Sequence, residues 1–354
     1  MDVIVVVAAI LAALSVLVMV HELGHLIVAK LAGVEVEFFD IGVGPTLLSR
    51  TDRKGTAYNL KAIPLGGHAQ LLDGWGSEID DANRARSYPE AAAAWKLPIT
   101  LAGSGLNFLV AFAVLLVLAL GGATYSVAVI DEPTGKALEA GMRGGDEIVA
   151  VDGAATANWQ DVGLAFFDRI GDTGSLAITV SRGGDRHTFA LPIREWQSDR
   201  RFMNVFEDLG VAPSPAGVHL SAGSVFRRVG SAIEETFVLG ITVAAAGFKM
   251  IFAEMSIVNF FGPLYLLLLG DDGNSLDWVD YARLFALFSI ALGIINLLPG
   301  PVVDGVGVAL ATGELVTRKR ATARVERNVR YCGFVVGFGP LVLCIGYEIA
   351  RIFA

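Results

Sequence analysis

Long uncharged stretches limit the possible folds of this sequence more than any other feature. From Leu97 to Ile130 no residue is charged, and Ile99 to Gly122 within this stretch is typical of a transmembrane helix. Val3 to Val20 is apolar except for Ser15 and is long enough to cross most of a bilayer. With 54% hydrophobic residues, 18% charged residues and a mean hydropathy of +0.58, the chain is more apolar than a soluble core requires. The sequence therefore predicts an integral membrane protein.

Two later apolar segments, Leu284 to Leu298 and Tyr331 to Tyr347, bring the expected number of transmembrane helices to about four. The helical pattern of the first segment continues through Leu26 to Leu31. A cleaved signal peptide is the alternative for this first segment. No Lys or Arg precedes it and charged residues follow it, which is opposite to the order in a signal peptide, so a spanning helix is favoured.

Basic residues indicate the orientation of these helices, because cytoplasmic loops are enriched in Lys and Arg. They gather between the first and second helices and between the third and fourth, as Lys30, Arg50, Arg53, Lys54, Lys61, Arg318, Lys319, Arg320, Arg324, Arg327 and Arg330. We expect both segments to be cytoplasmic and the stretch from about Thr124 to Leu276 to be periplasmic. The net charge of -9 and the lack of a basic cluster with interleaved aromatic residues argue against nucleic acid as a partner.

The first part of the outer stretch has the alternation of a small β domain. Its expected elements are a helix and four short strands, Trp159 to Arg169, Ser126 to Ile130, Glu147 to Val151, Leu176 to Ser181 and Thr188 to Pro192. The run from Ala137 to Gly153 resembles a sequence stretch of PDZ domains. Another small β sandwich is the alternative. The following segment, Val225 to Met255, mixes charged residues with an apolar face, which fits a helix on the membrane surface or a span.

The motif with the clearest chemistry is His21-Glu22-Leu23-Gly24-His25, an H-E-x-x-H pattern. Two histidines one helical turn apart face the same way, so both can bind one zinc ion. Glu22 then lies beside the metal, where its carboxylate can take a proton from a water made acidic by zinc. Three such groups in a spanning helix indicate a functional site, although three residues merely at a helix end are the alternative.

A catalytic zinc needs a third protein ligand and an open position. The remaining histidines, His68, His187 and His219, lie in loops or in the outer domain, so a carboxylate is the natural candidate. Asn296 to Gly305 ends the third apolar segment with two prolines and one acid, Asp304. Asp304 is therefore the expected third ligand. The alternative is that it caps the helix that follows.

Together, H-E-x-x-H and the later N-x-x-P-x-P-x-x-D-G segment resemble the site-2 protease family of intramembrane zinc metalloproteases, in its bacterial RseP-like branch. Phe38 to Pro45 and Ala62 to His68 are similar to the membrane-associated β-hairpin that receives substrate as an added strand in this family. Leu101 to Phe108 and Phe261 to Pro263 are similar to two further family segments. The chain departs from the family pattern at Ser104, Gly300 and Val306.

The resemblance implies regulated intramembrane proteolysis of single-span membrane proteins after a first cleavage on the outer side. Anti-sigma-factor-like proteins and signal-peptide remnants are the implied substrates, and the bacterial inner membrane is the implied location. Glu22 would be the catalytic base, and His21, His25 and Asp304 would bind one Zn²⁺. Asn296, Asn107, Gly66 and Gly67 would contact substrate, and the PDZ-like domain would bind a ligand or a substrate ectodomain.

The expected fold is a polytopic α-helical membrane protein with a cytoplasmic-side membrane-associated β-hairpin and an inserted periplasmic PDZ-like β domain. Its segments are residues 1–33, first transmembrane helix; 34–96, hairpin and cytoplasmic loop; 97–122, second helix; 123–222, PDZ-like domain; 223–278, amphipathic or membrane-surface segment; 279–312, third helix; and 313–354, cytoplasmic loop and fourth helix. A non-enzymatic PDZ-containing membrane scaffold is the main alternative function. A transporter is a second, but the sequence shows no internal symmetry.

Overall fold

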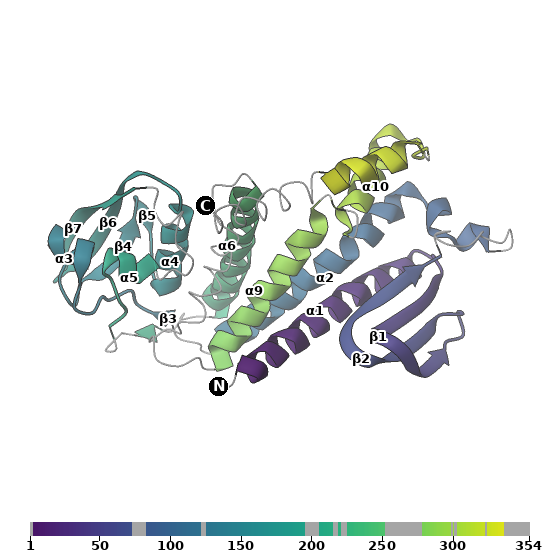
Figure 1. Cartoon of the computed structure of the whole chain (residues 1–354), viewed down its shortest axis with the longest axis horizontal. Coiled ribbons are helices and arrows are strands. Elements are labelled where there is room, and N and C mark those ends of the chain that lie inside the picture. Colours follow the sequence, from purple (N-terminus) through teal and green to yellow (C-terminus); the bar gives the residue numbers. More distant parts are fainter. Residues whose placement is uncertain are drawn as a thin grey trace, which may run out of the picture. The chain divides into compact units, whose positions relative to one another are not determined.

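The chain forms two compact units, one of residues 1–111 with 287–339 and one of 112–286 with 340–354 (Figure 1). The computed structural model describes residues 3–72, 83–121, 125–194, 205–214, 219–220, 225–251, 278–298, 300, 303–322 and 324–335. The first unit is called the helical unit below. Residues 125–220, in the second unit, are called the β domain.

Among the described residues, two helices are long and apolar enough to cross a membrane. They are α1, Val3–Leu31, in which the span begins at Ala8, and α2, Ala93–Leu120. The second begins six residues before the expected start at Ile99 and includes Pro98. Pro98 is the sixth residue of this helix, so it removes one helical hydrogen bond, the one to the carbonyl oxygen of Ala94, without ending the helix.

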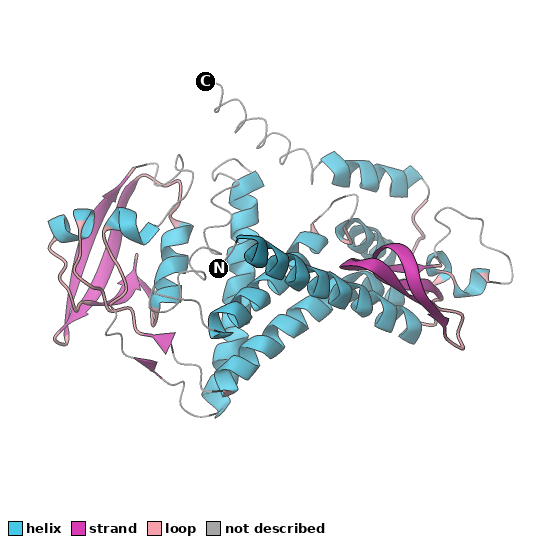
Figure 2. Cartoon of the chain, turned by 60° about the horizontal axis from the view of Figure 1, so that its bottom comes forward, coloured by secondary structure: helices cyan, strands magenta, loops and turns pink. Residues whose placement is uncertain are grey.

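Between these helices the chain makes a long antiparallel hairpin of β1, Val36–Thr51, and β2, Ala57–Leu71 (Figure 2). Its register pairs Val36 with Leu71, and several bulges shift the pairing along the strands. Strand β2 packs on α1, and a Cβ added to Gly67 would lie 2.9 Å from the carbonyl oxygen of Asp40 and 3.6 Å from the Cα of Met19. Glycine therefore permits this close approach of the hairpin to the helix.

The third apolar segment forms α9, Trp278–Leu297, and is followed by α10, Gly305–Thr317. The two prolines predicted to break the chain between them, Pro299 and Pro301, lie outside the described residues. A further helix occupies residues 324–335, whereas the rest of the expected fourth span, up to Tyr347, is also outside them. The expectation of about four transmembrane helices therefore stays a prediction.

The β domain contains a four-stranded antiparallel sheet in the order β5-β4-β6-β7. Its strands are β4, Glu147–Val151; β5, Ala154–Ala155; β6, Gly174–Arg182; and β7, Asp185–Ile193. A tight Gly183-Gly184 turn joins β6 to β7, with both glycines at positive φ (62° and 97°). Two-residue hairpin loops of this kind match the twist of the strands, so the paired glycines set the register.

The described part of the β domain also contains three short helices and a second, two-stranded sheet. They are α3, Gly135–Ala140; α4, Trp159–Asp168; α5, Val205–Leu209; β3, Tyr125–Ser126; and β8, His219–Leu220. The expected strand from Ser126 to Ile130 is wrong as a continuous element. The N–H of Val129 bonds to the carbonyl oxygen of Val127, 2.7 Å away, and this tight turn leaves only single bridges at Val129 and Ile130.

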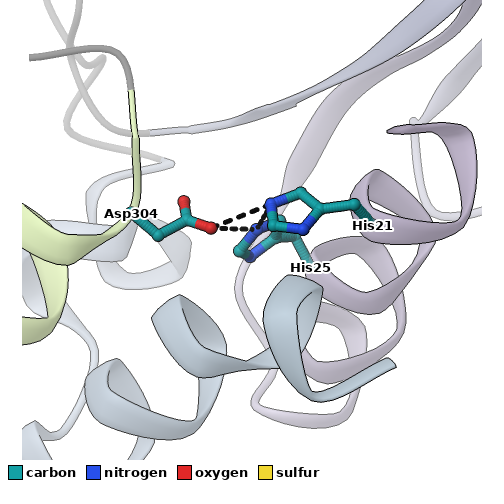
Figure 3. Close-up of side chains that lie close together, drawn as sticks. All are labelled: His21, His25 and Asp304. Atoms are coloured by element: carbon teal, nitrogen blue, oxygen red, sulfur yellow. Dashed lines mark hydrogen bonds and ion pairs between the residues drawn. The ribbon is translucent and has the colours of Figure 1, made fainter. Parts of the chain in front are cut away.

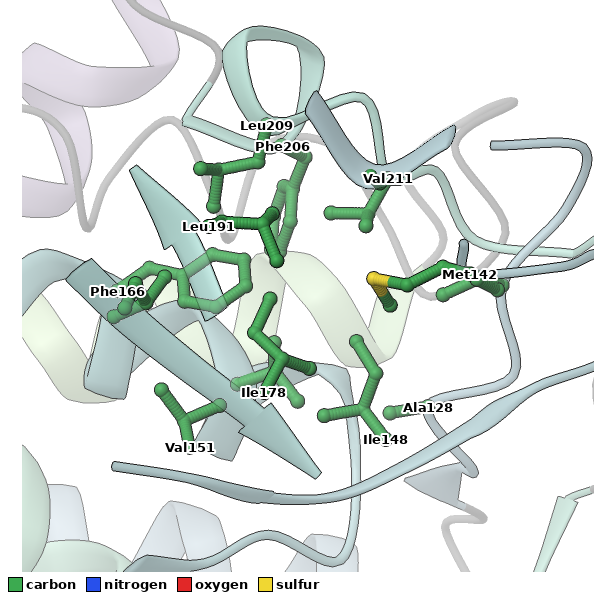
Figure 4. Packing of buried hydrophobic residues seen from close by; sticks show 14 of the residues in the cluster. Ala128, Met142, Ile148, Val151, Phe166, Ile178, Leu191, Phe206, Leu209 and Val211 are labelled. Atoms are coloured by element: carbon green, nitrogen blue, oxygen red, sulfur yellow. The ribbon is translucent and has the colours of Figure 1, made fainter. Parts of the chain in front are cut away.

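One apolar cluster forms the core of the β domain (Figure 4). Phe166 of α4 lies against Phe206 of α5, and Ile178 of β6 and Leu191 of β7 lie on one face of the sheet, all at most 6% exposed. The alternation predicted for these strands is therefore present. Their assignment to a PDZ-like domain stays a prediction.

Helix α6, Val225–Ile251, falls in the segment predicted to be amphipathic. Ala232, Leu239 and Val243 are buried, whereas Phe226 and Phe237 are exposed. Residues 252–277, which include the family-like Phe261 to Pro263, are outside the described part of the chain. Whether this segment spans the membrane or lies on it stays a prediction.

Candidate active site

Helix α1 carries His21, Glu22 and His25 in one turn. Both histidines are buried, and their rings meet edge to face with centroids 4.9 Å apart. Residues four apart on a helix lie one above the other, so the motif itself places the two imidazoles together. In Figure 3 both side chains point from the same helix toward Asp304.

Asp304 meets the two imidazoles from the start of α10. Its Oδ2 is 2.9 Å from His21 Nε2 and 3.0 Å from His25 Nε2, and these two nitrogens are 3.2 Å apart (Figure 3). Asp304 holds the N-cap position of α10, but its side chain makes no capping hydrogen bond. The capping alternative is therefore not supported.

The spacing of these atoms suits a small tetrahedral ion. Ligand atoms bound to zinc at about 2.0–2.2 Å lie roughly 3.3 Å from one another in a tetrahedral site. The three observed separations are close to that value, and the three groups are the only such cluster of His, Cys and acidic side chains among the described residues. Two imidazoles and one carboxylate are also the ligand types of many catalytic zinc sites.

The outer nitrogens of both imidazoles face α2. The Nδ1 of His25 lies 2.8 Å from the main-chain oxygen of Ile99, which can only accept, so Nδ1 carries the proton and Nε2 is left free for a metal. The Nδ1 of His21 lies 3.3 Å from the side-chain amide of Asn107. Both rings are thus oriented by groups of one neighbouring helix.

Two glycines allow the helices to approach at this point. A Cβ added to Gly103 of α2 would lie 2.4 Å from His25 Nε2 and 2.6 Å from His21 Nε2. A Cβ added to Gly24 of α1 would lie 2.3 Å from the carbonyl oxygen of Ala102. Heavy atoms cannot approach so closely, so any larger residue at either position would push α2 away from the histidines or fill the space between them.

The half-buried carboxylate of Glu22 is held by the hairpin. Its Oε2 accepts a hydrogen bond of 2.8 Å from the main-chain N–H of Ala69 in β2. This bond fixes the acidic group beside the histidine pair, and it makes the position of β2 part of the geometry of the site. The role of Ala69 was not predicted from the sequence, because a main-chain donor has no signature in the side-chain pattern.

The expected substrate-contacting residues differ in their surroundings. Asn107 is fully buried beside His21, whereas Asn296 of α9 is half-buried and donates to the main-chain oxygen of Leu292, 3.0 Å away. Gly66 and Gly67 lie where β2 packs on α1, beside Val18 and Met19. Within the described residues, a hydrogen bond therefore joins Asn107 to the histidine cluster, whereas that of Asn296 goes to its own helix.

Comparison with known proteins places the chain among metallopeptidases. A model of Peptidase family M50 matches residues 9–340. A protein of Vibrio cholerae serotype O1 named "Putative zinc metalloprotease" is 26% identical over 442 aligned positions, which cover 96% of this chain and 97% of that protein. A Clostridium acetobutylicum protein with the same kind of name is 27% identical over 326 positions, covering 92% and 91% of the two chains.

A second group of relatives is more similar over a shorter region. Protease RseP of Yersinia pestis is 36% identical over 209 positions, which cover 58% of this chain and 46% of that protein. The match of the family model over most of the sequence confirms the predicted resemblance. The chain is a membrane-embedded zinc metalloprotease that belongs to peptidase family M50, the site-2 protease family.

Proposed function

We propose that this protease cleaves single-span membrane proteins within or near the bilayer, after a first cut on their outer side. The observation that carries the proposal is the meeting of Asp304 with His21 and His25, which lie on a helix long enough to span a membrane. Polar groups of this kind are costly in a spanning helix unless they serve a site or line a wet cavity. A site at this depth can act on a membrane segment that soluble proteases do not reach.

His21, His25 and Asp304 would hold the zinc ion. Bound there, zinc would act as a Lewis acid that polarises the scissile carbonyl and makes water a better proton donor. Glu22 accepts a proton from the attacking water and later delivers it to the leaving amine. The hydrogen bond from the N–H of Ala69 keeps its carboxylate oriented during both transfers.

The hairpin would present the substrate. A helical substrate hides its peptide bonds within its own hydrogen bonds, so it must be extended before cleavage. Pairing with an edge of the β1-β2 hairpin would hold a segment extended, because edge strands offer free main-chain donors and acceptors. The link from β2 to Glu22 supports this role, because it connects the substrate-holding strand to the catalytic base.

The proposal also gives roles to three further residues and to the β domain, and it names the substrates and the location. Asn296, Gly66 and Gly67 would help to steady the substrate backbone, and the PDZ-like domain would filter substrates or read new C-termini in the periplasm. Anti-sigma-factor-like proteins and signal-peptide remnants are the proposed substrates, and the bacterial inner membrane is the proposed location. One relative from Salmonella typhi is named "Regulator of sigma E protease", which supports the first substrate class.

The test is zinc content and cleavage of a single-span model substrate by the purified full chain. We expect wild type to hold about one zinc and to cut, Glu22→Gln to keep zinc without cutting, and Asp304→Ala to lose zinc. Glu139→Gln, an exposed acid of the β domain, is the matched control and should match wild type. Cleavage by Glu22→Gln at the wild-type rate, or full zinc binding by Asp304→Ala, would overturn the assignment of these residues.

A further inference from the structure

One face of α2 forms an outer layer around the histidine pair. Ile99, Gly103 and Asn107 are spaced by four residues, so they lie on one side of the helix. The main-chain oxygen of Ile99 contacts His25, Gly103 leaves room beside both imidazoles, and the amide of Asn107 contacts His21. Each imidazole therefore has its own partner on this face.

The contact between Asn107 and His21 does not suit an imidazole whose Nε2 binds a metal. The amide nitrogen Nδ2 of Asn107, which can only donate, lies 3.3 Å from His21 Nδ1, and its oxygen Oδ1 is buried without a hydrogen-bond partner among the described residues. An imidazole whose Nε2 faces a metal carries its proton on Nδ1, so two donors would face each other. A buried acceptor without a donor is unfavourable as well.

Turning the amide by 180° removes the contact between two donors and gives the oxygen a donor, and it moves the amide nitrogen to the buried position that the oxygen held. The oxygen and nitrogen of an asparagine amide have nearly the same shape, so their assignment follows from the hydrogen bonds that they make. With Oδ1 toward His21, the Nδ1–H has an acceptor and the orphaned oxygen gains a donor. His21 would then be held in the same way as His25, whose Nδ1 faces the oxygen of Ile99.

The burial of Asn107 argues against contact with substrate. Its exposed fraction is 0%, and the buried hydroxyl of Ser289 in α9 donates to its main-chain oxygen over 2.8 Å. A cross-helix hydrogen bond therefore fixes the backbone at Asn107. Its side chain lies at the Nδ1 side of His21, whereas Asp304 lies at the Nε2 side.

We propose that Asn107 is a positioning residue of the metal site, which accepts the Nδ1–H of His21 and holds the tautomer whose Nε2 binds zinc. The inference rests on the proposed role of His21 as a ligand, and it replaces the substrate contact expected for Asn107 from the sequence. Partners of this kind orient a ligand and raise its basicity, so their loss lowers metal affinity.

The experiment measures zinc affinity of the purified full chain by competition with a chelator, so its readout does not depend on cleavage. Asn107→Leu removes the acceptor, and we expect zinc affinity to fall by about 10- to 100-fold. Asn107→Asp keeps an acceptor at the same position, and its affinity should stay within about threefold of wild type, since carboxylates often accept this proton in zinc sites. Ser104→Ala, which changes another buried polar residue of α2, should match wild type.

Each outcome decides the proposal. Wild-type zinc affinity in Asn107→Leu, or equal losses in Asn107→Leu and Asn107→Asp, would overturn it, because the second result would show that an acceptor is not what His21 needs. If Asn107→Leu fails to fold, which thermal unfolding of the zinc-free protein would reveal, a loss of zinc affinity of more than about threefold in Asn107→Asp would still overturn the proposal. Absence of zinc from wild type would instead refute the proposed metal site.

Discussion

The β domain and the helical unit bury different kinds of side chains. In the β domain the buried cluster is apolar, with Phe166, Ile178 and Leu191 fully buried. In the helical unit the buried residues include a set of polar ones, namely His21, His25, Lys96, Ser104 and Asn107. Close approaches there include two at glycines: a Cβ added to Gly24 would meet the main chain of Ala102, and one added to Gly103 would meet both imidazoles.

This difference follows from the solvent around each region. A domain in water is stabilised by removing apolar surface from water, so each missing methyl group costs stability. Helices in lipid gain little from apolar burial, and small residues and polar contacts hold them together instead. We therefore expect removal of side-chain atoms to be the harmful change in the β domain, and addition of atoms or loss of a polar partner to be harmful in the helical unit.

The largest effect should come from one added methyl group, in Gly103→Ala. Its Cβ would lie 2.4 Å from His25 Nε2, where the proposed zinc ligands converge, so we expect loss of zinc and at least a 100-fold loss of cleavage. Gly105→Ala is the matched control, because a Cβ there meets nothing within 4 Å. Zinc content and cleavage rate measure both variants. Normal zinc content in Gly103→Ala would show that α2 can move away at little cost, and the contrast between the two regions would fail.

The second effect is a deletion in the β domain. Phe166→Ala would leave a cavity in the apolar cluster, and we expect it to lower the free energy of unfolding of this domain by about 4 kcal/mol. Leu138→Ala, at a residue that is 58% exposed, should cost less than about 1 kcal/mol. Hydrogen exchange on the full chain can follow β6 and α1 separately. We expect zinc content and the protection of α1 from exchange to stay as in wild type. A change in either would contradict the expectation that this substitution affects only the β domain.

Side-chain chemistry made most of the site predictable from the sequence. His21, Glu22 and His25 lie in one motif whose spacing matches a helical turn, and Asp304 is the one acid at the end of the third apolar segment. The structure brings the two histidines and Asp304 together, whereas their roles stay predictions until zinc binding is measured. The partners of these residues could not be found in this way, because the oxygen of Ile99 and the N–H of Ala69 belong to the main chain.

The fold was predictable where hydrophobic period and turn residues agreed. Strands β6 and β7 alternate strictly and are joined by Gly183-Gly184, so both were expected close to their actual bounds. The strand predicted from Ser126 to Ile130 does not form as one element. The apolar residues of this segment are compatible with a paired strand, but they do not reveal the turn at Val127 to Val129. The short helix α3 has too few residues for a periodic signal.

The third effect tests a polar contact of the helical unit. Lys96 of α2 pairs with Glu314 of α10 at 2.7 Å, and both side chains are at most 11% exposed. Lys96→Met leaves a buried carboxylate without its partner, so we expect about 3 kcal/mol of destabilisation, seen as a lower midpoint of thermal unfolding. Because α10 begins next to Asp304, zinc should also dissociate more readily.

Two controls define the origin of this effect. Lys96→Met combined with Glu314→Leu removes both charges and should recover most of the stability. Arg320→Ala breaks the more exposed pair with Glu90 and should cost no more than about 1 kcal/mol. If the double variant is as unstable as Lys96→Met, packing of the lysine stem rather than its charge would explain the loss.

The smallest effect concerns Asp146, which in the described part of the β domain is the one charged side chain as deeply buried as the core. Burial alone would raise the pKa of Asp146, but the two hydrogen bonds from Arg182, both 2.7 Å long, and the N–H of Arg143 outweigh it and hold the pKa below 3.8. A lowered pKa in the folded state means that the carboxylate stabilises the domain fully above pH 3.8 and loses this contribution as the pH falls through the lowered value.

Asp146→Asn should therefore cost about 2 kcal/mol at neutral pH and flatten the loss of stability in acid. Asp185→Asn, at an exposed acid of the same sheet, is the control and should keep the wild-type acid dependence. Hydrogen exchange of β6 in the full chain between about pH 3 and 7 measures both variants, after correction for the intrinsic exchange rate. If Asp146→Asn remains as acid-sensitive as wild type, this ion pair does not set the pH response, and the β domain depends on its apolar core even more completely than the comparison with the helical unit suggests.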